Sequence, residues 1–294
     1  MKILLPGLAL LTALASAACV GPTPSPTPTS ETTVLTLRPV LGSTDLSVGS
    51  NRLVLALLDS RSAPIRATAA ELTLALEQGD ATTFRDSVEA VFRPWSAGLG
   101  GVFTAQIEFD RAGTWLAEIS PLDGEFAGEK ARLVFTVTEQ SATPGLGTPA
   151  PASDTRTASD AATLEEVTSD LNPDPDLYAI SVADALQSGL PLVVSFSTPA
   201  FCSSATCGPQ LSVVKQLKDS YSDKANFIHV EIYANPKEMQ GDPESAEISP
   251  IVDEWGLPTE PYTFVIDVQG RVAAKFEAFV SYPELEEALV PLLE

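Results

Sequence analysis

Cys202 and Cys207 are separated by four residues in the segment FSTPAFCSSATCGPQ, residues 196–210. An apolar run precedes this segment, and a helical pattern follows it. Cysteine thiolates exchange disulfides and bind metal ions, and a disulfide can also simply hold a loop in place. Four intervening residues leave room for disulfide geometry. The segment is therefore the first candidate for chemistry, and the residues alone leave all three uses open.

The third cysteine, Cys19, follows an apolar stretch at residues 3–18. A transmembrane helix needs roughly 20 apolar residues, so this stretch predicts a signal peptide over 1–18 instead. The small residues at 16–18 resemble a bacterial lipobox, in which the following cysteine is lipidated; Ser16 departs from that pattern, which usually has an aliphatic residue there. We expect an exported protein anchored to the outer face of the cell membrane by Cys19, or a secreted one if Cys19 is not lipidated.

A lipidated Cys19 would leave Cys202 and Cys207 as an even pair. In an exported protein such a pair is normally oxidised or redox-active. The formal net charge of −22 argues against nucleic acid and against an anionic lipid surface as partners, because both require a basic surface.

Composition divides the rest of the chain into four parts. A Pro/Thr stalk over 19–30 is expected to stay extended. Short alternating apolar runs over 31–140 predict about seven strands and a β-sandwich. The stretch FDRAGTWLAEIS at 109–120 resembles a strand pair of immunoglobulin-like bacterial modules, including the YtkA-like group. Residues 141–176 are rich in Ala, Ser, Thr, Pro and Gly and predict a disordered linker. Residues 177–294 alternate strand and helix patterns.

The motifs TCGPQ at 206–210 and EPYTFVIDVQGRV at 260–272 resemble extracytoplasmic proteins of the thioredoxin-like fold. The expected fold class is therefore multidomain, with an N-terminal all-β, immunoglobulin-like sandwich and a C-terminal α/β thioredoxin-like domain. The resemblance implies a cis proline at Pro261 that presents backbone to a bound peptide. It also implies Cys202 and Cys207 as catalytic residues. The C-x4-C spacing departs from the C-x-x-C of thioredoxins, and Gln210 stands where their second cysteine would be.

The start of a helix lowers the pKa of a cysteine through unpaired N–H groups and the helix dipole. Gly208 and Pro209 place Cys207 just before such a start, with Pro209 at or near the first helical position, so Cys207 is the better thiolate or leaving group. His229 is the single histidine of the chain, and it lies inside a strand pattern where packing is a commoner role than metal binding. We expect no metal and no cofactor; copper delivery stays a minor alternative.

The leading expectation is thiol–disulfide exchange with extracytoplasmic proteins that carry thiols or disulfides. The competing expectation is a non-enzymatic, lipid-anchored binding module in which Cys202 and Cys207 form a structural disulfide. No nucleic acid is expected as a partner. The residues identify neither the substrate nor the direction of electron flow.

Overall fold

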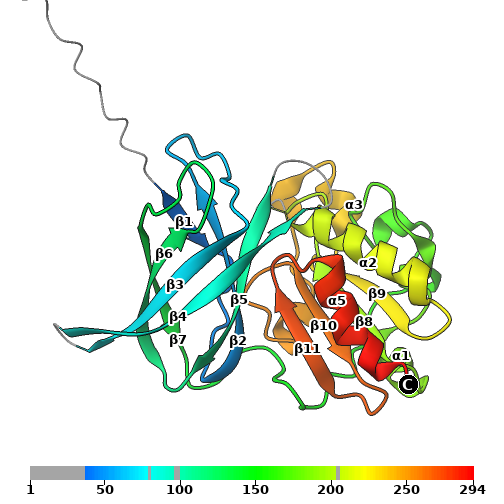
Figure 1. The fold of residues 1–294 in the computed structure, drawn as a ribbon. Coiled ribbons are helices and arrows are strands. Elements are labelled where there is room, and N and C mark those ends of the chain that lie inside the picture. Colours follow the sequence, from blue (N-terminus) through cyan, green and yellow to red (C-terminus); the bar gives the residue numbers. More distant parts are fainter. Residues whose placement is uncertain (1–36, 79–80, 96–99, 203–205) are drawn as a thin grey trace, which may run out of the picture. The chain divides into compact units, whose positions relative to one another are not determined.

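The computed structural model describes residues 37–78, 81–95, 100–202 and 206–294. The predicted signal peptide, the stalk and Cys19 lie outside these residues. Leu35–Glu294 form one compact unit (Figure 1). Within the described ranges, none of the helices has the length and apolar character needed to cross a bilayer.

The first half of this unit is a single antiparallel sheet of seven strands in the order β1-β2-β5-β4-β3-β6-β7. The strands are β1 (Arg38–Leu41), β2 (Gly49–Leu58), β3 (Ala69–Gln78), β4 (Ala81–Pro94), β5 (Gly101–Phe109), β6 (Gly113–Pro121) and β7 (Ala131–Val137). The expected number of strands and the β-sandwich character of this region are confirmed.

Side-chain alternation explains the core of this sheet. Alternate residues of β5, from Phe103 to Phe109, are buried as their period-2 pattern predicts. Trp115 of β6 is also buried, and its ring lies 5.0 Å from the Phe109 ring in an edge-on arrangement. Trp115 therefore belongs to the core, as expected of a large aromatic side chain in an all-β region.

The sheet nearly closes on itself. The strands at its two ends, β1 and β7, are followed by segments that pair with each other. The Thr138 N–H donates to Leu46 O at 2.9 Å, and the Val48 N–H donates to Thr138 O at 2.9 Å. The sheet is thus closer to a barrel than to two separate sheets.

The second half holds a four-stranded sheet in the order β11-β10-β8-β9, in which only the β8–β9 pair is parallel. Its strands are β8 (Leu192–Ser197), β9 (Asn226–Glu231), β10 (Tyr262–Ile266) and β11 (Val272–Glu277). Every residue of β8 and β10 is buried, because helices and loops cover both faces.

The helices of this half are α1 (Val182–Gln187), α2 (Cys207–Tyr221), α3 (Pro236–Met239), α4 (Pro250–Glu254) and α5 (Tyr282–Leu289). Short 3₁₀ turns occur at η1 (Ala158–Asp160), η2 (Leu164–Glu166), η3 (Pro175–Tyr178), η4 (Pro243–Ser245) and η5 (Val290–Leu292). Prolines at 236, 243 and 250 each start a new short turn, which keeps the region after β9 from forming one long helix.

The expected fold class is wrong. The described chain is mostly β, and among its helices only α2, with 15 residues, is longer than 8 residues. It contains no clear C-terminal α/β thioredoxin-like domain.

Polar contacts instead join the two sheets into one unit: Arg52 Nε lies 3.1 Å from Glu284 Oε1, and the Thr44 N–H donates to Glu277 at 2.7 Å. These partners are more than 200 residues apart in the chain, so strand and helix order did not reveal them. The boundaries expected at 140 and 176 stay predictions.

Residues 141–176 make regular contacts, although their composition predicts a disordered linker. The Ala150 N–H donates to Gly270 O at 2.9 Å, and the Trp255 indole N–H donates to Ser153 Oγ at 2.8 Å. Val167 is buried in an apolar cluster with core residues of the second half. Backbone hydrogen bonds and buried hydroxyl groups hold this segment. A prediction of disorder from the small number of large apolar residues takes neither of them into account.

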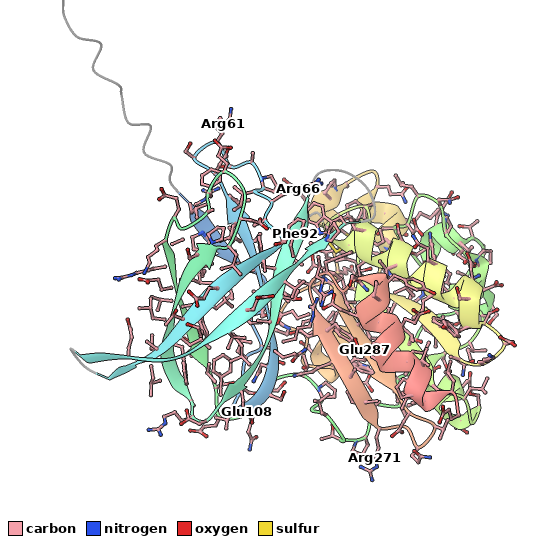
Figure 2. The ribbon with its side chains drawn as sticks, viewed as in Figure 1. Arg61, Arg66, Phe92, Glu108, Arg271 and Glu287 are labelled. Atoms are coloured by element: carbon pink, nitrogen blue, oxygen red, sulfur yellow. A yellow bond between two sulfur atoms is a disulfide. The ribbon has the colours of Figure 1, made fainter. Side chains whose placement is uncertain are left out.

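Charged side chains occupy the surface. Figure 2 shows Arg61, Glu108 and Arg271 directed away from the ribbon, and all three are exposed. Solvated charges of this kind are ordinary on a protein surface and do not by themselves imply a binding site.

Candidate functional site

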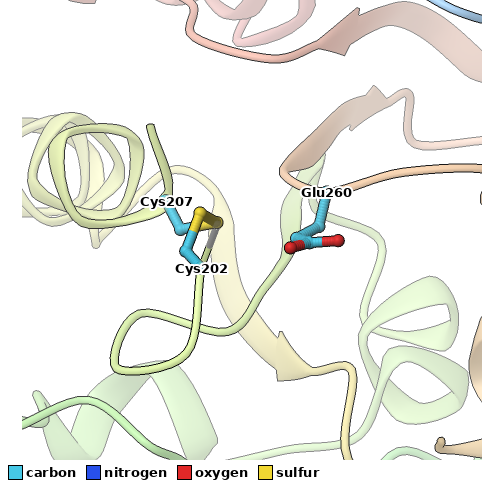
Figure 3. A group of neighbouring side chains, drawn as sticks. All are labelled: Cys202, Cys207 and Glu260. Atoms are coloured by element: carbon cyan, nitrogen blue, oxygen red, sulfur yellow. A yellow bond between two sulfur atoms is a disulfide. The ribbon is translucent and has the colours of Figure 1, made fainter. Parts of the chain in front are cut away.

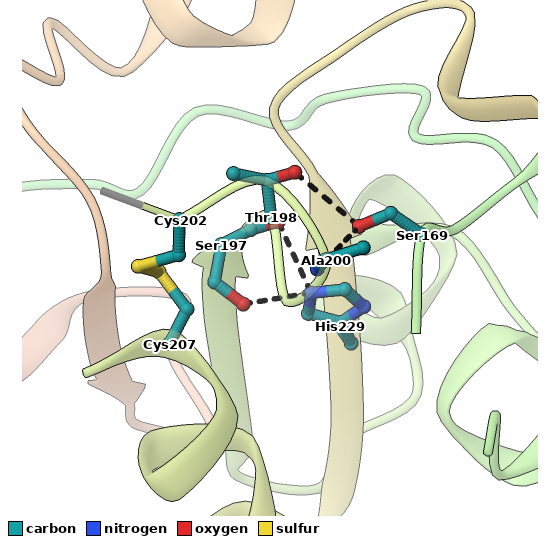
Figure 4. Close-up of a disulfide and its surroundings, with 7 residues drawn as sticks. All are labelled: Ser169, Ser197, Thr198, Ala200, Cys202, Cys207 and His229. Carbon is teal, nitrogen blue, oxygen red and sulfur yellow. Dashed lines mark hydrogen bonds between the residues drawn. A yellow bond between two sulfur atoms is a disulfide. The ribbon is translucent and has the colours of Figure 1, made fainter. Parts of the chain in front are cut away.

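The loop between β8 and α2 carries Cys202. Three hydrogen bonds fix the start of this loop: the Phe201 N–H donates to Thr198 O at 3.2 Å, the Ala200 N–H donates to Ser169 Oγ at 3.3 Å, and the Ser169 and Thr198 hydroxyls are 3.3 Å apart. Figure 4 shows Ser169 and Thr198 beside the loop that leads to the disulfide. The strand end and its hydroxyl partners therefore set the position of Cys202.

Cys207 is the first residue of α2, after the N-cap residue Thr206. Pro209 is the third residue of the helix, where a backbone N–H has no intrahelical acceptor and its loss costs nothing. The first-turn N–H groups give this end of the helix a partial positive charge, which stabilises a thiolate on Cys207. The sequence predicted Cys207 just before the helix, whereas in the structure Cys207 is itself the first helical residue.

The two cysteines form a disulfide with a Cα–Cα distance of 6.1 Å (Figure 4). Cys207 has no exposed surface, whereas Cys202 is half-buried. An attacking thiol therefore reaches the Cys202 sulfur more easily than the Cys207 sulfur. The predicted pairing of Cys202 with Cys207 is confirmed.

Gln210 lies one helical turn after Cys207 and is fully buried. Its Nε2 donates to Thr263 Oγ1 at 3.1 Å, and its Oε1 accepts from the Val280 N–H at 2.8 Å. Thr263 in turn donates to Ser195 Oγ at 3.2 Å. Gln210 thus joins α2, β10 and the segment just before α5 through hydrogen bonds, at the position where thioredoxins carry their second cysteine.

Glu260 is the acidic residue of the site. One carboxylate oxygen of Glu260 and the two cysteine Sγ atoms all lie within 4.8 Å of one another (Figure 3). Glu260 is half-buried, and burial raises the pKa of its carboxyl above the usual range. Sequence reasoning missed this residue, although its position directly before Pro261 was the available signal.

Pro261 follows Glu260 through a cis peptide bond. Pro261 is buried, and its carbonyl accepts a hydrogen bond of 2.9 Å from the Ala278 N–H. The cis geometry agrees with the sequence expectation. The role in presenting backbone to a peptide stays a prediction.

His229 of β9 lies behind the loop and is buried. Its Nε2 is 2.9 Å from Ser197 Oγ (Figure 4). Its Nδ1 is 2.8 Å from the Tyr178 hydroxyl. Burial lowers the pKa of His229 to about 4. Because both ring nitrogens have partners, His229 is a packed residue and a poor candidate for a metal ligand.

No protein-family model matches the chain, and no curated protein matches it. Among solved structures the chain is similar to murine CRIg, with a TM-score of 0.22, 10% identity, and coverage of 34% of this chain and 97% of that one. It is also similar to MtrC from Shewanella baltica OS185, with a TM-score of 0.26, 10% identity, and coverage of 50% of this chain and 28% of that one. Likenesses this weak carry no argument about fold or function.

The fold and the site define a mostly β protein with a disulfide at the start of a helix. The site combines a half-buried cysteine, a buried cysteine at a helix N-terminus and a nearby carboxyl group. This set of groups can act in thiol chemistry, or it can staple the loop to the helix.

Proposed function

We propose that this protein exchanges disulfides with extracytoplasmic proteins through Cys202 and Cys207. The observation that carries the proposal is the difference between the two sulfurs: Cys202 is half-buried in a loop, and Cys207 is buried at the start of α2. Two half-buried aromatic rings, Phe201 and Tyr233, lie next to this loop with centroids 6.3 Å apart. They offer an apolar surface to a protein partner.

In the exchange, a partner thiolate attacks the Cys202 sulfur and forms a mixed disulfide. The Cys202–Cys207 bond breaks, and its electron pair stays on Cys207 as a thiolate, which the helix N-terminus stabilises. A second partner thiolate then attacks the partner sulfur of the mixed disulfide and releases the Cys202 thiolate. The partner gains a disulfide, and the protein gains two thiols after proton uptake. The same steps run in reverse with an oxidised partner.

The location proposed for this exchange is the outer face of the cell membrane. The apolar stretch before Cys19 supports export, and Cys19 supports anchoring through a lipid. The partners we propose are exported proteins with thiols or disulfides. Labelling of the full chain with a radioactive fatty acid in a bacterial host, compared with Cys19→Ser, tests the anchor.

The second candidate is a binding module in which the disulfide only staples the loop. The observation that favours it is the full burial of Cys207, together with the hydrogen bonds that already order the loop near Ser169. In that case the disulfide would resist reduction and no exchange would occur.

The reduction potential of the pair separates these candidates. The full chain with Cys19→Ser is equilibrated in glutathione or dithiothreitol buffers, and the two thiols are counted by alkylation. A potential of roughly −120 to −270 mV supports exchange, whereas a value below about −300 mV indicates a structural disulfide. In addition, Cys207→Ser should trap a mixed disulfide on Cys202 with oxidised glutathione, and Cys202→Ser should trap far less. Equal trapping in both variants contradicts the assigned roles.

A further inference from the structure

Three donor atoms meet at one point beside α2. The Sγ atoms of Cys202 and Cys207 and a carboxylate oxygen of Glu260 lie within 4.8 Å of one another. Figure 3 shows the Glu260 carboxyl group facing the disulfide from the neighbouring segment. The three residues come from two places in the chain, so the fold alone brings them together.

We propose that, once the disulfide is reduced, the Cys202 and Cys207 thiolates and the Glu260 carboxylate bind one Zn²⁺ ion. This inference goes beyond disulfide exchange and requires only that the bond can be reduced. Oxidation removes both sulfur ligands at once, so the site exists in one redox state of the protein. Sequence reasoning kept copper delivery as a minor alternative, and it did not connect Glu260 with the cysteines.

Distances support three ligands on one ion. Zinc takes thiolate sulfur at about 2.3 Å and carboxylate oxygen at about 2.0–2.2 Å. Two ligand atoms on a tetrahedral zinc are then roughly 3.4–3.8 Å apart. The three donor atoms now lie within 4.8 Å of one another, and side-chain rotations can bring them to the separations that zinc requires. The Cα–Cα distance of 6.1 Å lets both cysteines reach one ion once their bond is broken.

The donor set selects zinc. Two thiolates exclude Mg²⁺ and Ca²⁺, which prefer oxygen ligands, and a carboxylate oxygen is a poor ligand for Cu⁺. His229 does not supply a fourth ligand, because both of its ring nitrogens are hydrogen-bonded. In the described ranges, the group of candidate ligands has these three members. The fourth position is left to water, as in sites with an open coordination position.

The binding steps balance. A phosphine reductant takes the disulfide to two thiols, and the phosphine becomes its oxide with oxygen from water. Zinc then replaces the two thiol protons, which are released to solvent, and Glu260 binds as the carboxylate. Two protons therefore leave for each ion bound, if Glu260 is already ionised.

A zinc titration of the full chain tests the site. Cys19→Ser serves as background, so that Cys202 and Cys207 provide the only thiols. The protein is reduced with a phosphine and titrated with Zn²⁺ against a chromogenic chelator, and Co²⁺ is used in parallel because its absorption reports thiolate ligands. Variants are Glu260→Gln, Cys207→Ser and, as the matched control, Glu254→Gln on the exposed end of α4.

We expect one Zn²⁺ per reduced chain and none on the oxidised chain. Glu260→Gln should weaken the apparent affinity about tenfold or more while the Co²⁺ spectrum still shows two thiolates, and Glu254→Gln should have no effect. Tryptophan fluorescence checks that each variant is folded.

Equal zinc affinity in Glu260→Gln and the Cys19→Ser background overturns the assignment of the carboxylate. Affinity no tighter in the reduced background than in Cys207→Ser overturns the site. Neither result bears on exchange, which the reduction potential measures separately.

Discussion

Arg52 of β2 and Glu284 of α5 form an ion pair between the seven-stranded sheet and the C-terminal helix, with an Nε–Oε1 distance of 3.1 Å and side chains that are only 6% and 13% exposed. Arg52 also donates to Phe279 O at 2.8 Å. A buried pair of this kind fixes how its two elements pack, because removal of Arg52 leaves Glu284 in a poorly solvated place with Arg93, at the longer distance of 3.6 Å, as its cationic partner.

We therefore expect Arg52→Ala to lower the free energy of unfolding by about 3–5 kcal/mol. Urea denaturation followed by tryptophan fluorescence measures the loss. The control is Arg132→Ala, which removes the 66%-exposed partner of Glu118 and should cost about 0–1 kcal/mol. Similar losses in the two variants would show that the Arg52–Glu284 pair contributes no more than a surface pair.

Gln210 provides the second prediction. Gln210→Ala leaves the Val280 N–H without its acceptor, and an unsatisfied buried donor costs about 1–3 kcal/mol. The loss of buried side-chain volume adds to this. Gln216→Ala, on the exposed face of the same helix, is the control and should change stability by less than about 0.5 kcal/mol. Chemical denaturation of both variants checks the difference.

His229 should make stability depend on pH. Its pKa is about 4 in the folded protein and about 6.5 when unfolded, so the unfolded chain binds more protons between these values. The stabilising contribution is complete above about pH 6.5 and is lost as the pH falls toward about 4, by up to about 3 kcal/mol.

The measurement is the difference in unfolding free energy between the wild-type chain and His229→Gln at several pH values. The single histidine makes the assignment direct. Glu231 on the same strand face has a raised pKa because it is buried, which gives a contribution of the opposite sign. The contribution of Glu231 is present in both proteins, so it cancels in the difference between their unfolding free energies. A difference that does not vary between pH 4 and 6.5 contradicts the role assigned to burial.

The segment 141–176 yields a fourth prediction. Ser153→Ala removes the acceptor of the buried Trp255 indole N–H, and we expect a loss of about 1–3 kcal/mol together with faster proteolysis inside the segment. Asp154→Asn, at an exposed neighbouring position, should leave both unchanged. If the wild-type chain is already cleaved rapidly there, the contacts of Ser153 do not order the segment in solution.

Local patterns predicted the parts of the fold that depend on short stretches of chain. The alternation around Phe109 identified a strand with one buried face, and Gly208–Pro209 identified the start of α2. The partners of Gln210 could not be found this way, because Thr263 and Val280 are 53 and 70 residues away. For the same reason, the carboxyl group of Glu260 was not recognised beside the cysteines.

Residue order also suggested a fold class that the structure contradicts. Alternating strand and helix patterns after residue 177 do not specify how long each helix becomes or which strands run parallel. Prolines at 236, 243 and 250 shortened the helices, and polar pairs such as Arg52–Glu284 joined the halves. Neither effect is visible in hydrophobic periodicity.

The near closure of the seven-stranded sheet has a consequence for how the protein behaves when crowded. Exposed strand edges recruit other chains and seed aggregates. Thr138 forms backbone hydrogen bonds with Leu46 and Val48, just beyond the two terminal strands of the sheet. These backbone groups are therefore not free to pair with another copy of the chain. The net charge of −22 adds mutual repulsion between copies. Dense packing of many copies on a surface should therefore leave them separate molecules.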